Sequence, residues 1–415
     1  GNISVNVLTS DTEALVDGVT GAVGGDLSIT ATDTIEIIAI GGGVAIGQQT
    51  GVGASLGANV IDADVAAALR GATTNISVTG ALVVTATNDK TLRSVSVSAG
   101  ATKDSAYAFT ISVNIVLGTT AATISGATID GPTRVEVKAS DESNLQAIAG
   151  ALGLGLDGNG LGGALGWNQV GITTTAGIID ATLTNVAGTV DVIAESTEAD
   201  SLMDGTILAA SIGAAGSSGS SVGGALSINI VTSAVSAEIT RSTVTAGGLV
   251  TVTANDQSTI RALAGGVAFS YTSASSASIG AAIAVNIIGE TLILDIVPGV
   301  SATVDTSTID TDGGLEVLAT SEQTIDSLTL GFAATVSNSG SGSSTGTGTD
   351  TGTSTGTDSG TDTPDTTGYG SGGSFSFTGA GSVSVNSISR PTSAEVLAST
   401  LTLGGPLVVK ATDAS

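Results

Sequence analysis

Seven asparagines recur at one position of a repeated phrase, and their type and spacing could support specific chemistry. Each closes a short alternating segment, as in "ISVN", "LSIN" and "IAVN". The set is Asn6, Asn59, Asn114, Asn168, Asn229, Asn286 and Asn386. An amide side chain both donates and accepts, so identical amides in register can hydrogen bond to one another. We predict a structural Asn ladder, and ligand binding by these amides is the less favoured alternative.

Acidic residues follow a second recurring position, an alanine that closes phrases such as "LVVTA" and "VTVTA". They are Asp33, Asp89, Asp141, Glu195, Asp256, Glu322 and Asp413, and "DTDGG" adds Asp310 and Asp312. Carboxylate oxygens are ligands that Ca²⁺ prefers, so the five aspartates that follow the alanines and the "DTDGG" pair are candidates for weak calcium sites. Solvated acidic turns are the favoured interpretation. The offset from the alanine varies, and "DTDGG" lacks the downstream Glu of a calcium loop.

Composition argues against catalysis. The 415 residues include no His, no Cys and nine aromatic residues, and the acids are spread evenly along the chain. A glycoside-cleaving site would need an asymmetric carboxylate cluster. We therefore expect no enzyme activity and no cofactor other than Ca²⁺.

Charge also limits the partners. With 37 acidic and 10 basic residues, the net charge is −27. Such a field repels nucleic acid and anionic membrane surfaces. The longest uncharged run, 262–289, is interrupted by Gly and Ser and alternates with period two, so we predict no membrane insertion.

The same markers show that the chain is a repeat array. Spacings between successive marker asparagines are 53, 55, 54, 61, 57 and 100 residues, and the marker alanines give a similar series. Seven units of about 55 residues therefore form one array over 1–415, beginning near residues 1, 52, 107, 161, 222, 279 and 379. Each unit predicts an Asn strand, a second strand, a Gly-pair turn as in "STVTAGG", a strand ending at the alanine, an acidic turn and an apolar strand.

The spacing of 100 comes from an insertion in the sixth unit. Residues 337–374 are almost entirely Gly, Ser, Thr and Asp. Such a segment buries too little apolar surface to offset the entropy of ordering, so we predict a disordered loop. The markers resume in step after it, so it is not a domain boundary.

The strand phrases predict the fold class. In "GAAIAVNII", Ile283 and Val285 occupy one face, and Ala284 and Asn286 the other. Neither face carries charge, which is typical of strands covered on both sides. A unit of 55 residues has too little core to stand alone, and stacking its neighbours supplies one. We predict an all-β, elongated β-solenoid resembling a parallel β-helix, with one, two or three coils in each unit.

The repeated phrases also resemble a known family. The order "SxNxI", "AxI", "STVTAGG", "VTVTA" and "ALAGG" is similar to the repeat regions of giant secreted bacterial surface proteins, the filamentous-haemagglutinin-like adhesins. The resemblance covers all seven units outside the insertion. It implies a rigid right-handed β-helical stalk without catalytic residues, although the unit here is longer than is typical of that family.

Together these patterns predict a structural protein of the bacterial cell surface, a stalk, fibre or sheath module. The alternative is a binding module whose variable loops contact a glycan, receptor or surface. Neither end of the sequence carries a divergent capping unit, so we expect either continuation into more repeats or end-to-end self-association. Charged residues in place of Ile3 and Val5 would suppress that association.

Overall fold

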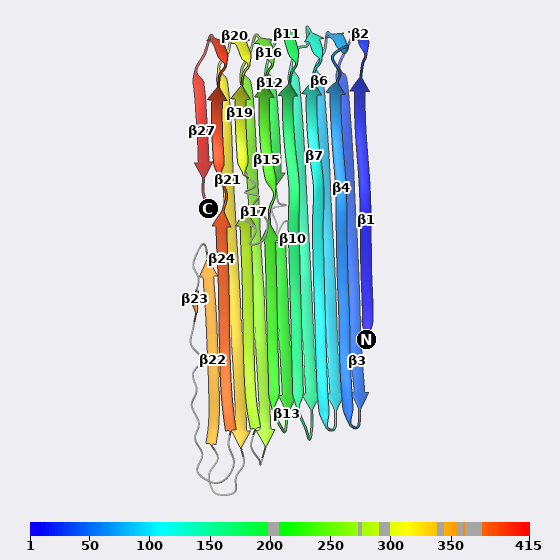
Figure 1. Cartoon of the computed structure of the whole chain (residues 1–415), viewed down its shortest axis with the longest axis vertical. Coiled ribbons are helices and arrows are strands. Elements are labelled where there is room, and N and C mark those ends of the chain that lie inside the picture. Colours follow the sequence, from blue (N-terminus) through cyan, green and yellow to red (C-terminus); the bar gives the residue numbers. More distant parts are fainter. Residues whose placement is uncertain (198–206, 273–275, 290–298, 338–343, 356–359, 362–375) are drawn as a thin grey trace.

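The computed structural model describes residues 1–197, 207–272, 276–289, 299–337, 344–355, 360–361 and 376–415. All regular structure in these residues is β-strand. Strands of successive repeats lie side by side and pair in parallel (Figure 1). The predicted all-β solenoid is confirmed. Among the described residues, none forms a helix that is long and apolar enough to span a membrane.

Each repeat is a single coil. The chain runs along one long sheet, crosses to the other side through a short strand at the tip, and returns along a second long sheet (Figure 1). We name the three sheets the Asn sheet, the tip sheet and the Ala sheet, after their position or marker residue. The Gly pairs of phrases such as "STVTAGG" lie at the turn between the tip sheet and the Ala sheet.

The Asn sheet contains β1 (Asn2–Asp17), β4 (Thr50–Arg70), β7 (Ser105–Ser125), β10 (Gly160–Ile179), β14 (Ser221–Val231), β15 (Ala234–Thr240), β18 (Ser276–Gly289), β19 (Val300–Asp305), β23 (Gly360–Thr361), β24 (Ser376–Ser389) and β25 (Thr392–Leu397). The tip sheet contains β2 (Thr20–Val23), β5 (Asn75–Val78), β8 (Thr128–Asp130), β11 (Thr182–Val186), β16 (Thr243–Ala246), β20 (Thr308–Thr311) and β26 (Thr400–Leu403). The Ala sheet contains β3 (Leu27–Gly47), β6 (Leu82–Thr102), β9 (Val135–Gly155), β12 (Val190–Thr197), β13 (Ile207–Ser217), β17 (Val250–Thr272), β21 (Leu315–Ser337), β22 (Ser344–Thr355) and β27 (Leu407–Asp413).

The strands are long because period-two alternation continues through the predicted breaks. β6 and β9 each span 21 residues, and the carboxylates that follow the marker alanines lie within them. The predicted acidic turns are therefore wrong. Charge alone does not end a strand when no Gly or Pro interrupts it, and alternation still places every second side chain inward. As a result, the longest axis of the molecule lies along the strands rather than along the stack (Figure 1).

Part of the insertion is ordered, contrary to the prediction for 337–374. β22 pairs antiparallel with β21, and the short β23 pairs antiparallel with β24. Residues 338–343, 356–359 and 362–375 lie outside the described residues. An edge strand gains backbone hydrogen bonds without burying a side chain, so a Ser/Thr/Gly segment can pair there. β22 thereby occupies the edge of β21.

The two long sheets enclose two kinds of interior. We call the part of each long strand on the side of the tip sheet the tip half. The remainder is the turn half, formed by 1–8, 50–61, 105–117, 160–172, 221–231, 276–289 and 376–389 of the Asn sheet and the Ala-sheet residues opposite them. The tip half holds a continuous core of Val, Ile, Leu and Ala, including Leu69, Ile129 and Leu183. A second apolar layer, including Ile61, Leu92 and Ile260, lies where the halves meet.

Small residues fill the turn half. Away from the second apolar layer, its apolar clusters in the described residues are groups of alanines, such as Ala225, Ala264 and Ala282. The larger side chains point outward, so Ile283 is 42% exposed while Ala284 is completely buried. The prediction that both faces of these strands are covered is therefore wrong for the described structure. Only the face with the small residues packs against another sheet.

Candidate functional site

The seven marker asparagines lie opposite one another in register and form one ladder. In each step, Nδ2 of one Asn donates to Oδ1 of the next, at 2.8–3.0 Å. The ladder runs through Asn6, Asn59, Asn114, Asn168, Asn229, Asn286 and Asn386. Asn59, Asn114, Asn168, Asn229 and Asn286 are completely buried. Side chains buried in this way are not accessible to a ligand.

The ladder also ties the two long sheets together. Asn168 Nδ2 donates a second bond to the carbonyl of Leu208 at 2.7 Å, and Asn229 Nδ2 does so to Arg261 at 3.1 Å. Both of these carbonyls belong to the Ala sheet. Each such amide therefore uses one N–H along the stack and the other across it, which satisfies both donors.

Hydroxyls and glycines bring the sheets together in the rest of the turn half. Ser211 and Ser227 share a hydrogen bond of 2.7 Å across the sheets, and Ser327 and Ser384 share one of 2.6 Å. A Cβ on Gly223 would lie 1.9 Å from the carbonyl oxygen of Val267 in the opposite sheet. Backbone therefore packs directly on backbone here, and only glycine fits at that position.

Four of the candidate calcium ligands lie in one row of the Ala sheet but are not adjacent. The row runs Asp33, Asn88, Asp141, Ser196, Asp256, Ser321 and Asp413. An acid thus alternates with a neutral residue, so successive carboxylates are two strands apart, about 9.6 Å. That separation is too large for one cation to bridge them.

Two of these acids are buried and paired with cations in a polar layer between the tip-half core and the second apolar layer. Asp141 accepts from Lys90 Nζ at 2.6 Å and from Thr120 Oγ1 at 2.9 Å, and both charged side chains are essentially inaccessible. Asp256 lies 2.5 Å from Arg390 Nη1 and accepts from Gln323 Nε2 at 2.9 Å. Burial lowers the pKa of the Arg390 guanidinium, and the charge of Asp256 opposes that shift.

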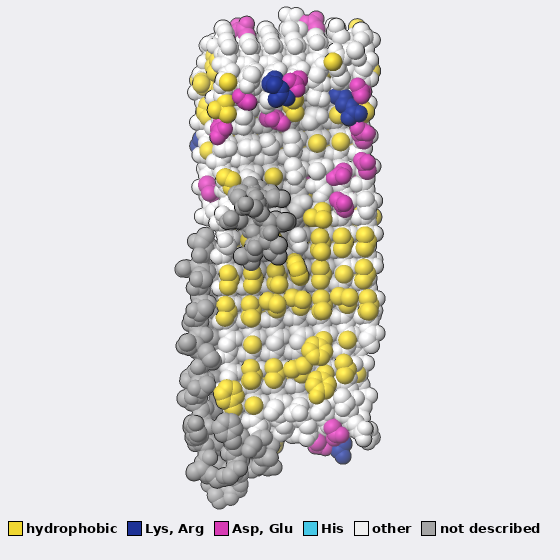
Figure 2. All heavy atoms as spheres, viewed as in Figure 1, with side chains coloured by type: hydrophobic (Ala, Val, Ile, Leu, Met, Phe, Trp, Pro, Cys, Tyr) yellow, Lys and Arg dark blue, Asp and Glu magenta, His cyan; other side chains and the backbone are white. Residues whose placement is uncertain are grey.

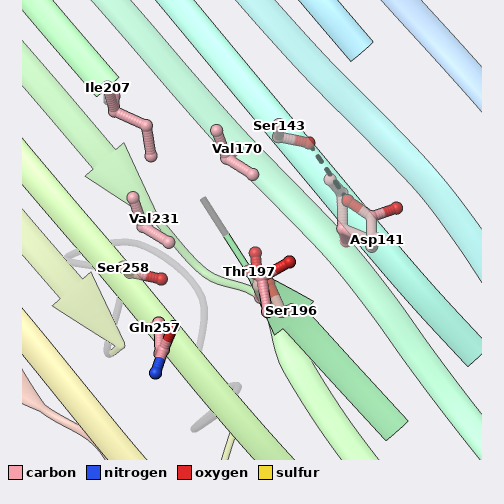
Figure 3. Close-up of a pocket in the computed structure, with 11 residues that line it drawn as sticks. Asp141, Ser143, Val170, Ser196, Thr197, Ile207, Val231, Gln257 and Ser258 are labelled. Carbon is pink, nitrogen blue, oxygen red and sulfur yellow. Dashed lines mark hydrogen bonds between the residues drawn. The ribbon is translucent and has the colours of Figure 1, made fainter. Parts of the chain in front are cut away.

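A small cavity adjoins this layer (Figure 3). Its lining includes Asp141, Ser143, Val170, Val231 and Ser258, contributed by both long sheets. Its volume is about 10 Å³, which is room for about one water molecule and too little for an organic ligand.

The remaining acids lie on outer surfaces. Asp89 and Glu142 are opposite each other on the Ala sheet. Burial and the negative charges of Asp89 and Asp141 raise the pKa of the Glu142 carboxyl. Two other acids are held by neighbours, because Glu195 pairs with Lys138 at 2.8 Å and Glu322 accepts from Gln257 at 3.3 Å.

Asp310 and Asp312 are exposed beside an open groove of about 370 Å³ at the tip sheet. Asn185 and Thr245 also line this groove. In the described part of the chain, no three acidic side chains gather closely enough to hold a metal ion. The structure therefore does not bring the candidate calcium ligands together.

The outer surface of the turn half carries rows of large apolar side chains (Figure 2). One row contains Ile3, Leu56, Ile111, Leu165, Leu226, Ile283 and Val383. The next contains Val5, Ala58, Val113, Trp167, Ile228, Val285 and Val385. The Ala sheet is similar, with Ile40, Leu152 and Val267 exposed by 71%, 40% and 37%. We call the outer face of the Asn sheet in the turn half the apolar face.

Sequence reasoning missed both this face and the buried ion pairs, although a signal for each was present. The marker alanine Ala86 is inward, so period two places Asn88 and Lys90 inward as well. In the same way, an inward Asn286 requires Ile283 and Val285 to point outward. Because the ladder asparagines point inward, the alternation along each strand identifies which apolar residues are exposed.

Comparisons of the chain with protein-family models, with curated proteins and with solved structures found no match.

Proposed function

We propose that this chain is a structural repeat module of the bacterial cell surface, part of a stalk, fibre or sheath. The observation that carries the proposal is the uninterrupted Asn ladder through all seven coils. Successive coils pair strand to strand through the described part of the stack, as in other solenoids, so tension applied along the stack passes from layer to layer. A buried row of amide bonds adds to the backbone bonds that resist separation of the layers.

Single-molecule pulling between residues 1 and 415 tests this proposal. These residues belong to opposite ends of the stack (Figure 1). We expect unfolding in successive steps that each release one coil or a whole number of coils, because each layer depends on its neighbours. Collapse of the array in a single event at low force would contradict a mechanical role.

The second candidate is a binding module, and the position of its variable loops favours it. The turns after β3, β6 and β9 all lie at the end of the molecule opposite the tip sheet (Figure 1). Repeat proteins often bind through loops gathered in this way. Under this alternative, deletion of 338–375 or exchange of these turns abolishes adhesion to a glycan, receptor or surface. The deletion then changes the circular dichroism by no more than the loss of β22 and β23.

End-to-end self-association remains a proposal as well. It is supported by β1, which pairs on one side only, with β4. At the other end β22 lies antiparallel along β21, so an added strand would have to displace it there. Ile3 and Val5 point out of the sheet plane, toward the apolar face, and do not extend along the stack. Charged replacements at these residues therefore test the face rather than the edge.

A further inference from the structure

The apolar face combines exposure with a complete lack of charge. No Asp, Glu, Lys or Arg occurs in the seven segments that form it, 1–8, 50–61, 105–117, 160–172, 221–231, 276–289 and 376–389. Apolar side chains on it are well exposed, including Phe109 at 45% and Ile279 at 39%. A contiguous apolar area of this kind on a soluble protein usually marks an interaction surface.

The face is also large enough for stable association. Seven strands spaced about 4.8 Å apart, each contributing about 12 residues of about 3.3 Å, give an area of about 34 Å by 40 Å. Pairing two such faces would bury about 2,700 Å² in total, more than the ~1,600 Å² of a standard protein–protein interface.

A second copy of the chain fits this surface better than a lipid or an unrelated protein would. The apolar rows run straight across all seven strands with the strand spacing as their period. Only a surface with the same period can match every row, and an identical face has that period by construction. The face offers no Lys or Arg for lipid headgroups, and the net charge of −27 opposes an anionic membrane.

Charge decides the relative orientation. Exposed acids such as Asp11, Asp62 and Asp64 lie on the tip half of the same sheet, whereas Asp17 and Asp180 there are paired with arginines. Two copies with their tip halves together would bring these acids face to face. Two copies overlapping only through their turn halves, with strands antiparallel, keep the acids at opposite ends.

We propose that two copies of this chain pack face to face through their apolar faces, in a two-fold arrangement with the tip halves pointing away from each other. The proposal is independent of the stalk function, because it concerns contacts beside the stack rather than along it. It would join arrays laterally into pairs.

Sedimentation velocity over a concentration series tests this pairing. The disruptive variant carries Ile111→Lys and Ile283→Lys, which are 39% and 42% exposed on the apolar face. The matched control carries Leu152→Lys and Val267→Lys, which are 40% and 37% exposed on the Ala sheet. We expect dimers for the wild type and the control, and a dissociation constant raised at least about tenfold in the disruptive variant. Circular dichroism establishes that both variants keep their strands.

Three outcomes would overturn the proposal. The wild type could remain monomeric at high concentration, or the disruptive variant could associate as strongly as the wild type. The wild type could also float with uncharged phosphatidylcholine vesicles as a monomer, which would assign the face to lipid. None of these results bears on the pulling experiment, so the two proposals fail separately.

Discussion

The tip half and the turn half are built from the same strands but with opposite polarity. In the tip half large side chains such as Leu183 and Ile178 are buried and charged pairs such as Arg241–Asp180 lie outside. In the turn half glycine, alanine, serine and asparagine are inside and Ile or Phe side chains outside. The difference shows that a strand without charge does not reveal which of its faces is buried. The size of the inward residues decides how closely the sheets approach.

The largest loss of stability should come from breaking the buried ion pair at the boundary between the two halves. Lys90→Met leaves the Asp141 carboxylate buried without its cation, which should cost about 3–5 kcal/mol of unfolding free energy. The double variant Lys90→Met with Asp141→Leu should recover most of that loss, since apolar replacements of a buried pair are often tolerated. Urea denaturation measures both.

Arg241→Met provides the contrast for this pair, because Arg241 and Asp180 form an exposed ion pair in the tip half. Its effect should be much smaller. Equal losses from Arg241→Met and Lys90→Met would contradict the importance of burial.

The closeness of the sheets in the turn half is tested by two adjacent glycines. A Cβ at Gly223 would meet backbone at 1.9 Å, whereas a Cβ at Gly224 would meet nothing within 4 Å. Gly223→Ala should therefore destabilise the protein by about 3 kcal/mol. Gly224→Ala should be neutral or slightly stabilising, because it lowers the entropy of the unfolded chain. Equal effects, read from thermal melts, would mean that the sheets can separate at little cost.

Breaking the Asn ladder should lower the free energy of unfolding by a similar or smaller amount. Asn168→Ala removes the acceptor of Asn114 and the donor to Asn229. Leaving these groups buried and unpaired should cost about 1–3 kcal/mol. The neighbouring Gln169 points outward, so Gln169→Ala is the control and should change the unfolding free energy by less than about 0.5 kcal/mol. If the Asn168→Ala variant were as stable as the wild type, the ladder would not be what holds the coils together.

The smallest effect concerns Glu142 and depends on pH. Burial first, and then the charges of Asp89 and Asp141, raise the pKa of this carboxyl above its ordinary value of 4.5. A raised pKa in the folded state means that protonation stabilises the fold. The gain is complete below pH 4.5 and is lost as the pH rises through the folded-state pKa.

Glu142→Gln should accordingly exceed the wild type in stability at pH 7, and the difference should disappear below about pH 4.5. Glu316, whose neighbours in register are Thr251 and Val408, is the matched control. A difference that is independent of pH would point to a cause other than charge.

Much of the fold could be predicted from the sequence because each repeat carries the same kinds of residue at the same positions. The marker asparagines and alanines recur at matching positions, and stacked coils place matching positions opposite each other. Asn59 lies opposite Asn114, and Ala86 opposite Ala139, for this reason. The amide ladder followed from the chemistry of one residue type in register.

Only the tertiary structure decided which residues of the Asn sheet face which residues of the Ala sheet. Ser211 meets Ser227, and Gly223 meets Val267, through contacts between strands that share no marker. Lys90 finds Asp141 one coil away, and Arg390 finds Asp256 from the other sheet. Periodicity along a strand specifies two faces but not which of them turns inward. That choice depends on how small the facing residues are, and it is this choice that leaves the isoleucine rows of the turn half in contact with solvent.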